Sequence, residues 1–453
     1  MMRKIALCLT IFVLGGVFTG CNEDGKTPVS NDGTVANGDD GTGTAGGGSF
    51  KVVDVTAAAL LAPSATDPAA KTVAAGANDF AFRLGAELAK DAGGQNFVFS
   101  PYSVWMPLAA LVNATDTKYR DALLTALGAS GVTLDDINKA ASRMLYSLTT
   151  KPHYGSDPNP GTLKIANAIF VDKNVTLRMD FAQAFMDFYR GSSFNVDFLS
   201  PAAVIAVNSW ASENTEGLIT EVIKGFDPLT VAAIANAIYF SDRWKSEFKP
   251  EKTAEGDFHA PAGTARASYM QREGMIQDYY EDERAQAVSL PFAQGGGLCI
   301  ILPKSGAGSA GELYSSMTND DFVEIRKNSV LAEGKLLLPR FSIDNSVESL
   351  KESLEMLGVS LFEPDPVKGP IANLIEEDTR LWVTSVSQKA VVKVDEKGTT
   401  AAAVTVIAMA GNSVPQPQKT IEMICDRPFM FVLYDRTYDG GEQILFTGIV
   451  NKP

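Results

Sequence analysis

Side chains that could carry out acid–base, nucleophilic or metal chemistry are sparse in this sequence. Its 453 residues contain two histidines and four cysteines. His153 lies in a stretch rich in proline and glycine, and His259 is followed by Ala260 and Pro261. Neither histidine has a partner at metal-ligand spacing or a nucleophile motif beside it. The sequence therefore does not indicate an enzyme, and no cofactor or metal ion is expected.

The most unusual segment of the chain is residues 394–413. No charge occurs across residues 398–418, and the first proline after Gly398 is Pro415. The many β-branched residues lower helix propensity and suit a strand, and the polar residues argue against a membrane span. Pro415 and Pro417 indicate that the far end is an exposed loop. Composition alone leaves two interpretations open. The segment is either an ordinary core strand followed by a loop, or one segment that can adopt both the loop and the strand conformation.

Within this segment, residues 396–403 resemble the hinge of the reactive-centre loop of an inhibitory serpin. The resemblance implies that the cleaved loop enters the middle of a sheet as a new strand, with alternate side chains facing the core. A charge or a proline would obstruct that insertion, and neither occurs in residues 398–414. Gly398 lets the chain fold over. The hinge consists of Glu396, Lys397, Gly398, Thr399, Thr400, Ala401, Ala402 and Ala403. The inward positions are Thr399, Ala401, Ala403, Thr405, Ile407 and Met409.

The resemblance also implies a cleavage site in the loop, which extends over about residues 396–418. The family's usual spacing from Glu396 places the scissile bond between Asn412 and Ser413. The loop is several residues longer than that of antitrypsin, so three alternatives remain: Ile407, Met409 and Ala410. The small, apolar sequence suits the pockets of elastase-like or subtilisin-like proteases better than those of trypsin-like ones.

Further matches to the serpin family follow in order over residues 75–453. They are residues 96–103, 115–120, 208–211, 215–219, 235–244, 289–292, 298–304, 338–341, 354–358, 383–394, 426–431 and 444–448. The resemblance implies one α+β domain with the serpin fold: three β-sheets, about nine helices and an exposed reactive-centre loop.

Two groups of residues are implied to control the insertion of the loop. Trp244 and Arg340 belong to the breach, where the loop would first enter the sheet, and Arg340 is expected to pair with Glu396 until attack. The shutter, where strands must part, comprises Ser100, Ser103, Asn236 and Gln388. Many serpins have a histidine in place of Gln388, so pH dependence from that position is doubtful. Core packing, and capping by Ser100 of a helix that Pro101 opens, explain these residues equally well without the family.

The N-terminus resembles a bacterial lipoprotein signal peptide over residues 1–20. Arg3 and Lys4 precede an apolar run, and Cys21 is implied to be lipidated after cleavage. The alternative is an uncleaved membrane anchor, although the apolar run is short for a span. An acidic residue pair follows Cys21, as in some lipoproteins exported to the bacterial surface. We expect an outer-membrane lipoprotein, facing either the periplasm or the outside.

Residues 21–74 are predicted to be a flexible tether rich in Gly, Asp and Thr, with the serpin domain beginning at residue 75. Cys8 lies in the signal peptide, which leaves Cys299 and Cys425 in the folded body. Buried free thiols and a disulfide between these two are both open.

The implied function is irreversible inhibition of serine proteases, and of cysteine proteases as a further target class, through a covalent acyl-enzyme. The expected partners are target proteases and, through the lipid on Cys21, a membrane. The formal charge of −15 argues against nucleic acid. A monomer is expected. The rival hypothesis is a non-inhibitory serpin that binds a ligand or partner, although such members tend to carry charges or proline in the hinge.

Overall fold

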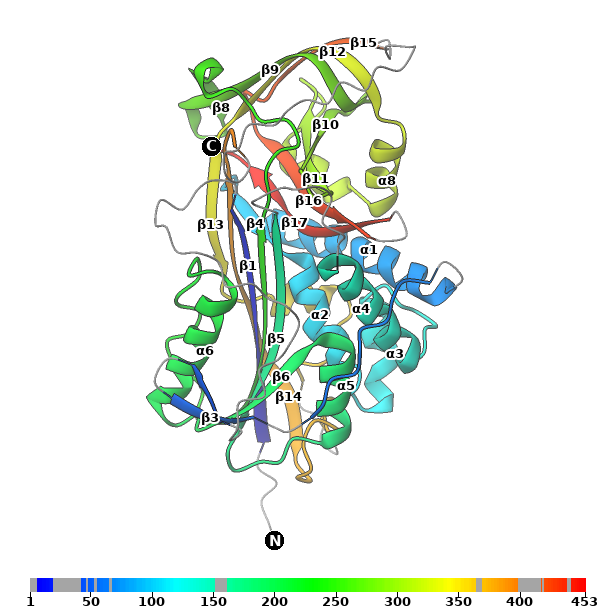
Figure 1. The fold of residues 1–453 in the computed structure, drawn as a ribbon, viewed down its shortest axis with the longest axis vertical. Helices are drawn as coiled ribbons and strands as arrows, with labels where there is room; N and C mark the ends of the chain where they lie inside the picture. Colours follow the sequence, from blue (N-terminus) through cyan, green and yellow to red (C-terminus); the bar gives the residue numbers. More distant parts are fainter. Residues whose placement is uncertain are drawn as a thin grey trace.

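The computed structural model describes residues 6–18, 42–45, 48–52, 55–64, 67–150, 161–363, 369–397, 417, 419–437 and 441–453. Helices and strands are mixed along this part of the chain (Figure 1). None of its helices is long and apolar enough to cross a membrane.

The helices gather mainly around one end of the long sheet (Figure 1). In the described residues they are α1 (Pro68–Asp91), α2 (Pro101–Leu111), α3 (Thr117–Ala126), α4 (Leu134–Thr149), α5 (Met179–Tyr189), α6 (Pro201–Asn214), α7 (Ala310–Ser316), α8 (Asn319–Lys327), α9 (Lys351–Met356) and the 3-10 helix η1 (Pro250–Lys252).

The strands vary widely in length. In the described residues they are β1 (Ala6–Phe18), β2 (Thr42–Ala45), β3 (Gly48–Val52), β4 (Phe97–Phe99), β5 (Thr162–Asp172), β6 (Gly191–Val196), β7 (Thr230–Ser241), β8 (Ala254–Ala260), β9 (Gly263–Glu281), β10 (Ala285–Pro291), β11 (Gly297–Pro303), β12 (Val330–Pro339), β13 (Phe341–Val347), β14 (Arg380–Val394), β15 (Lys419–Ile424), β16 (Phe429–Arg436) and β17 (Glu442–Val450).

The long sheet has the strand order β13-β14-β1-β7-β5-β6-β3-β2. Its middle consists of β14, β1 and β7, with β1 parallel to both neighbours. Figure 1 shows β1 in dark blue within this sheet. The sequence predicts a signal peptide here, and the structure places residues 6–18 of that segment as a central strand.

The other strands form a continuous array that bends along the 19-residue β9. One part of β9 pairs with β8 and β12, and β15 adds to β12. The last residues of β9 pair with β10, which continues through β11, β16 and β17 to β4. The array thus supplies two of the three sheets of the expected fold. Together with the nine α-helices of the described chain, it confirms the α+β prediction.

The core lies between the sheets and the α1–α4 group. Every residue of α2 is buried, because α2 lies beneath the long sheet and against α1, α4 and β17. Ser100 caps α2 by accepting a hydrogen bond from the Ser103 amide, and Pro101 occupies the first turn, as predicted. A second cluster joins α6 to β5 and β7, with Trp210 packed edge-on against Phe170.

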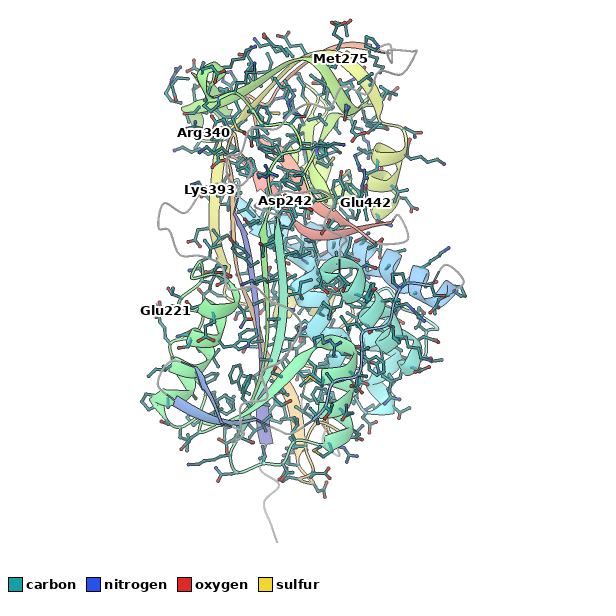
Figure 2. The ribbon with its side chains drawn as sticks, viewed as in Figure 1. Glu221, Asp242, Met275, Arg340, Lys393 and Glu442 are labelled. Carbon is teal, nitrogen blue, oxygen red and sulfur yellow. The ribbon has the colours of Figure 1, made fainter. Side chains whose placement is uncertain are left out.

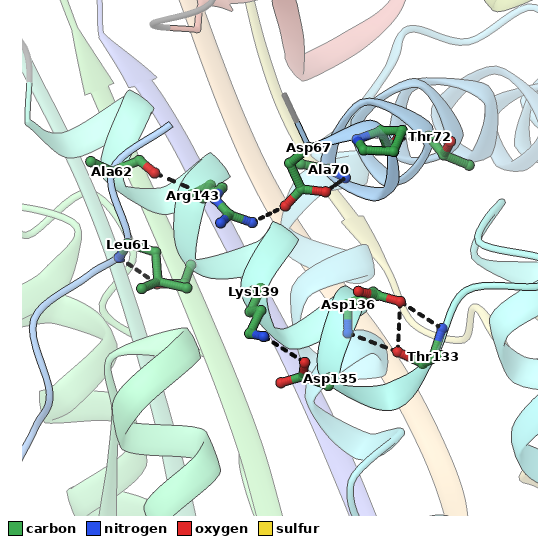
Figure 3. Close-up of polar contacts among 12 residues, drawn as sticks. Leu61, Ala62, Asp67, Ala70, Thr72, Thr133, Asp135, Asp136, Lys139 and Arg143 are labelled. Carbon is green, nitrogen blue, oxygen red and sulfur yellow. Dashed lines mark hydrogen bonds and ion pairs between the residues drawn. The ribbon is translucent and has the colours of Figure 1, made fainter. Parts of the chain in front are cut away.

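The described residues just before α1, 55–64 and 67, pack along the helices, and we call them the strap. Arg143 of α4 forms an ion pair with Asp67 and donates a hydrogen bond to the Ala62 carbonyl (Figure 3). The Leu61 amide donates to Ser142 Oγ at 3.0 Å. The predicted boundary at residue 75 therefore falls inside α1, and the last part of the predicted tether belongs to the folded body.

Cys299 and Cys425 are both buried free thiols, so the structure contains no bridge between them. Burial raises the pKa of the Cys299 thiol to about 11 and the pKa of Cys425 still further. Both side chains therefore stay protonated and act as small apolar groups in the core.

Candidate functional site

The chain leaves the upper end of β14 through Asp395, Glu396 and Lys397, and these three residues are tied to the segment after β7. Trp244 Nε1 donates to the Asp395 carbonyl at 2.8 Å. The Phe248 amide donates to the Glu396 carbonyl at 3.0 Å, and the Trp244 amide to the Lys397 carbonyl at 3.4 Å. Lower in the sheet, β1 separates β14 from β7. The start of the hinge thus closes the top of the gap that β1 fills.

The Glu396 carboxylate, only 5% exposed, is held by a dense set of donors. Arg340 Nε lies 2.8 Å from both carboxylate oxygens, and its terminal nitrogen lies 2.6 Å from Oε1. Thr253 donates its hydroxyl to the same oxygen. Figure 2 places Arg340 at the upper end of β13, where that strand pairs with β14 near Lys393. The structure therefore brings the predicted pair, Arg340 and Glu396, into direct contact.

Two neighbouring carboxyl groups respond oppositely to this environment. Burial opposes the ionisation of Glu396, but the hydrogen bonds from Arg340 and Thr253 outweigh it and leave the pKa of Glu396 below its ordinary value. Burial dominates at Asp395 and raises its pKa. Ionised Glu396 therefore stabilises the closed hinge, whereas ionised Asp395 opposes it.

Trp244 provides a rigid support for these contacts. Its side chain is 2% exposed. The ring stacks on Phe292 with centroids 4.8 Å apart, and Phe248 packs against it edge-on. The Arg272 guanidinium in turn lies over the Phe248 ring, 4.4 Å from its centroid. Because Phe292 and Phe248 fix the indole, its N–H is aimed at the Asp395 carbonyl.

Three of the four predicted shutter residues meet beneath the sheet. Gln388 of β14 accepts from the Ser100 amide at 3.1 Å and donates to the Ser100 carbonyl at 2.9 Å. The Ser100 hydroxyl bonds Ser103 Oγ at 3.0 Å and the Leu445 carbonyl at 2.7 Å. These polar groups are buried and joined by neutral hydrogen bonds, which a strand movement can exchange without exposing a charge.

Asn236, the fourth predicted shutter residue, is not joined to the other three. Its amide donates to Asn167 Oδ1 across β5 and β7, and Asn167 donates to the Tyr189 carbonyl. Sequence reasoning missed Asn167. A signal existed, because both strands contain the triplet Asn-Ala-Ile and the two asparagines pair in register. Thr253 was also missed, and its distance along the chain from Glu396 left no local signal.

Apart from Pro417, the rest of the predicted reactive-centre loop lies outside the described residues. So does the lipidation residue Cys21. The hinge residues concerned are Gly398, Thr399, Thr400, Ala401, Ala402 and Ala403, and the scissile-bond residues are Ile407, Met409, Ala410, Asn412 and Ser413. The far end of the loop is fixed where β15 begins, with Lys419 Nζ 2.8 Å from Glu281.

Comparison with known proteins identifies the family of this chain. The family model for serpins, described as a serine protease inhibitor, matches residues 75–453. The chain belongs to the serpin family. A serpin-like protein of Thermococcus kodakarensis is 31% identical over 386 residues, which cover 84% of this chain and 86% of the relative. The alpha-1-antiproteinase of Rattus norvegicus is 30% identical over 85% of this serpin and 90% of its own length.

Solved structures agree with the fold. The native state of the thermophilic serpin tengpin superposes with a TM-score of 0.73 at 25% identity, covering 88% of this chain and 98% of tengpin. Human thyroxine-binding globulin in complex with its ligand gives a TM-score of 0.69 at 22% identity, over 85% of this chain and 99% of the globulin. The second likeness concerns the fold alone.

Proposed function

We propose that this serpin inhibits serine proteases irreversibly, by offering its loop as a substrate and then inserting the cut loop into the long sheet. The observation that carries the proposal is the start of the hinge. Residues 395–397 close the top of the gap between β14 and β7 through exchangeable hydrogen bonds, and a segment free of charge and proline follows them. That combination suits a segment that remains outside until it is cut and then enters as a strand.

The proposed reaction begins when the protease nucleophile attacks the carbonyl at the scissile bond. An acyl-enzyme forms, and the C-terminal part of the loop departs with a new amino group. The freed loop then replaces the contacts of residues 395–397 and runs down the sheet, carrying the protease with it. Distortion of the protease active site stops water from releasing the acyl group.

The sheet geometry is long enough for this insertion. The gap already accommodates the 13 residues of β1. At ~3.3 Å per residue, a loop strand of about 14 residues spans ~45 Å. Its new backbone hydrogen bonds, at ~1 kcal/mol each, contribute roughly 10 kcal/mol before side-chain burial. That gain is comparable to the stability of a whole domain, so an uncut form whose gap is empty is metastable by a similar amount.

Elastase-like and subtilisin-like proteases are the proposed target class, with the cut between Asn412 and Ser413. The test is to mix the serpin with one protease of each kind and analyse the mixture on denaturing gels. A covalent band that survives denaturant supports trapping, and the mass of the released C-terminal peptide locates the cut bond. Cleavage without a covalent band for every protease tested would contradict inhibition by trapping and favour a non-inhibitory serpin.

We also propose that lipid on Cys21 anchors the serpin to a bacterial outer membrane, because the leader that precedes it has the composition of a lipoprotein signal. Labelled fatty acid should enter the wild-type protein and not the Cys21→Ala variant. Equal labelling of both proteins would refute the anchor. A monomeric elution volume in gel filtration is the expected result for a detergent-solubilised sample.

A further inference from the structure

The gap between β14 and β7, which we call the slot, is occupied by the chain's own N-terminal segment. The register runs from Ala6 opposite Arg380 to Phe18 opposite Lys393, so β1 fills the slot almost from end to end. On its other side β1 pairs with β7 up to Ser241. Figure 1 shows this strand rising from the N-terminus to the upper end of the sheet.

The composition of β1 suits this position. Its thirteen residues contain no charge and no proline, so nothing obstructs pairing on both edges. Ile11 is 0% exposed and belongs to the main hydrophobic core. The same two properties characterise the segment after Gly398, which the proposed mechanism brings to the same slot.

The two occupants cannot share the slot. Adjacent strands lie about 4.8 Å apart, so β14 and β7 are roughly 10 Å apart along their paired length, which leaves room for a single strand. The loop follows β14 after a turn and would run antiparallel to it, whereas β1 runs parallel. Insertion of the loop therefore requires the departure of β1.

The centre of the slot shows that β1 is an imperfect occupant. Val13 pairs in register with Gln388 on one side and with Asn236 on the other, so β1 separates two halves of the shutter. Asn236 is fully buried, and its Oδ1 finds no hydrogen-bond partner among the described residues. An unsatisfied buried acceptor destabilises this arrangement, which favours exchange of β1 for another strand or closure of the slot.

We infer that β1 is an internal plug: while residues 6–18 remain attached, the chain is held in a non-inhibitory form, and removal of the leader arms it. Hydrolysis of the Gly20–Cys21 amide adds water, leaving a carboxylate on Gly20 and an amine on Cys21, and frees β1 from the body. A precursor that folds before export is then unable to trap proteases inside the cell. The consequence for inhibition rests on the proposed function, whereas occupancy of the slot does not.

The experiment uses the full chain and two variants. Ile11→Asp places an unpaired carboxylate in the core and expels β1. Ala57→Asp, at an exposed position of the strap, is the matched control. The probe for an open slot is a synthetic peptide with the sequence of residues 399–409, followed by native electrophoresis. Hydrogen exchange reports the protection of β1 directly, and incubation with a subtilisin-like protease reports trapping.

The expected result is that amides of residues 6–18 in the wild-type chain exchange at least about tenfold more slowly than those of residues 55–60. Ile11→Asp should bind the peptide and form at least about tenfold more covalent complex than the wild type and Ala57→Asp. Fast exchange of residues 6–18, or equal peptide binding by all three proteins, would overturn the plug. If Ile11→Asp does not fold, wild-type exchange alone decides. Protection and selective peptide binding without trapping would uphold the plug and refute the proposed inhibition.

Discussion

The contact between Glu396 and Arg340 predicts how long the uncut serpin keeps its loop outside the sheet. Glu396→Gln removes the charge and preserves the size of the side chain. A hydrogen bond to a charged group contributes about 1.5–3 kcal/mol, and a neutral one about 0.5–1.5 kcal/mol. Arg340 is 48% exposed, so water compensates its guanidinium in the variant. We therefore expect the closed hinge to lose about 1–2 kcal/mol.

A loss of that size multiplies the population of the released hinge by a factor of about 5–30. Spontaneous conversion to a loop-inserted, inactive form should accelerate by a similar factor. The assay is the half-life of inhibitory activity at constant temperature, measured on a chain whose slot is open. Glu273→Gln is the matched control, because the Glu273–Lys252 pair is exposed at 47% and 43% and should contribute little. Equal half-lives for Glu396→Gln and Glu273→Gln would refute the role of the contact between Glu396 and Arg340.

Three further predictions follow from the same region. Asp395→Asn should stabilise the native form at pH 7, because the pKa of Asp395 is raised in the fold and its ionised form therefore destabilises the fold. In urea unfolding, the gain in stability over wild type should shrink as the pH falls toward about 4. A gain that does not change with pH would contradict this prediction. Gln388→Ala leaves the Ser100 amide without a hydrogen-bond partner in the core, whereas the Ser100 carbonyl keeps the Val104 amide as a donor. Thermal unfolding should therefore show a loss of about 1–3 kcal/mol. An unchanged midpoint would mean that the shutter bonds contribute nothing. Thr399→Arg should convert the inhibitor into a substrate on denaturing gels, because a charge cannot enter the sheet, and retained trapping would rule out insertion.

Acid should weaken the contact between Glu396 and Arg340. The folded pKa of Glu396 lies below its unfolded value, so the stability that it contributes is complete above the unfolded pKa, about 4.3, and is lost as the pH falls through the folded pKa. In Glu396→Gln the acid-induced loss of stability should be correspondingly smaller. An identical acid response in wild type and Glu396→Gln would show that the carboxylate is not the titrating group.

Local signals in the sequence predicted many of the elements that position the site. Ser100 followed by Pro101 indicates a capped helix start, and α2 begins there. Residues 289–292 and 298–304 match the serpin family, and β10 and β11, which overlap these segments, pair as an antiparallel hairpin. The family pattern supplied the nearness of Arg340 to Glu396, which no local rule could have given.

Local sequence signals could not predict the contacts between segments that lie far apart in the chain. Thr253 reaches Glu396 through tertiary structure alone. The strap has the composition of a linker, yet Arg143 and Ser142 of α4 bind its backbone. The N-terminal apolar run suits both a signal peptide and a central strand, because both need an uncharged stretch of about this length. In the folded chain this run pairs with β14 and β7 as a strand, and that tertiary contact has no local signal in the sequence.

Insertion of the cut loop is tested most directly by the thermal midpoint of a chain with an open slot, before and after a single nick near Asn412. The nicked protein should unfold at a much higher temperature, because a new central strand contributes roughly 10 kcal/mol or more. Hydrogen exchange should show residues 399–409 protected after the nick. An unchanged midpoint, with those amides still exchanging freely, would contradict the mechanism.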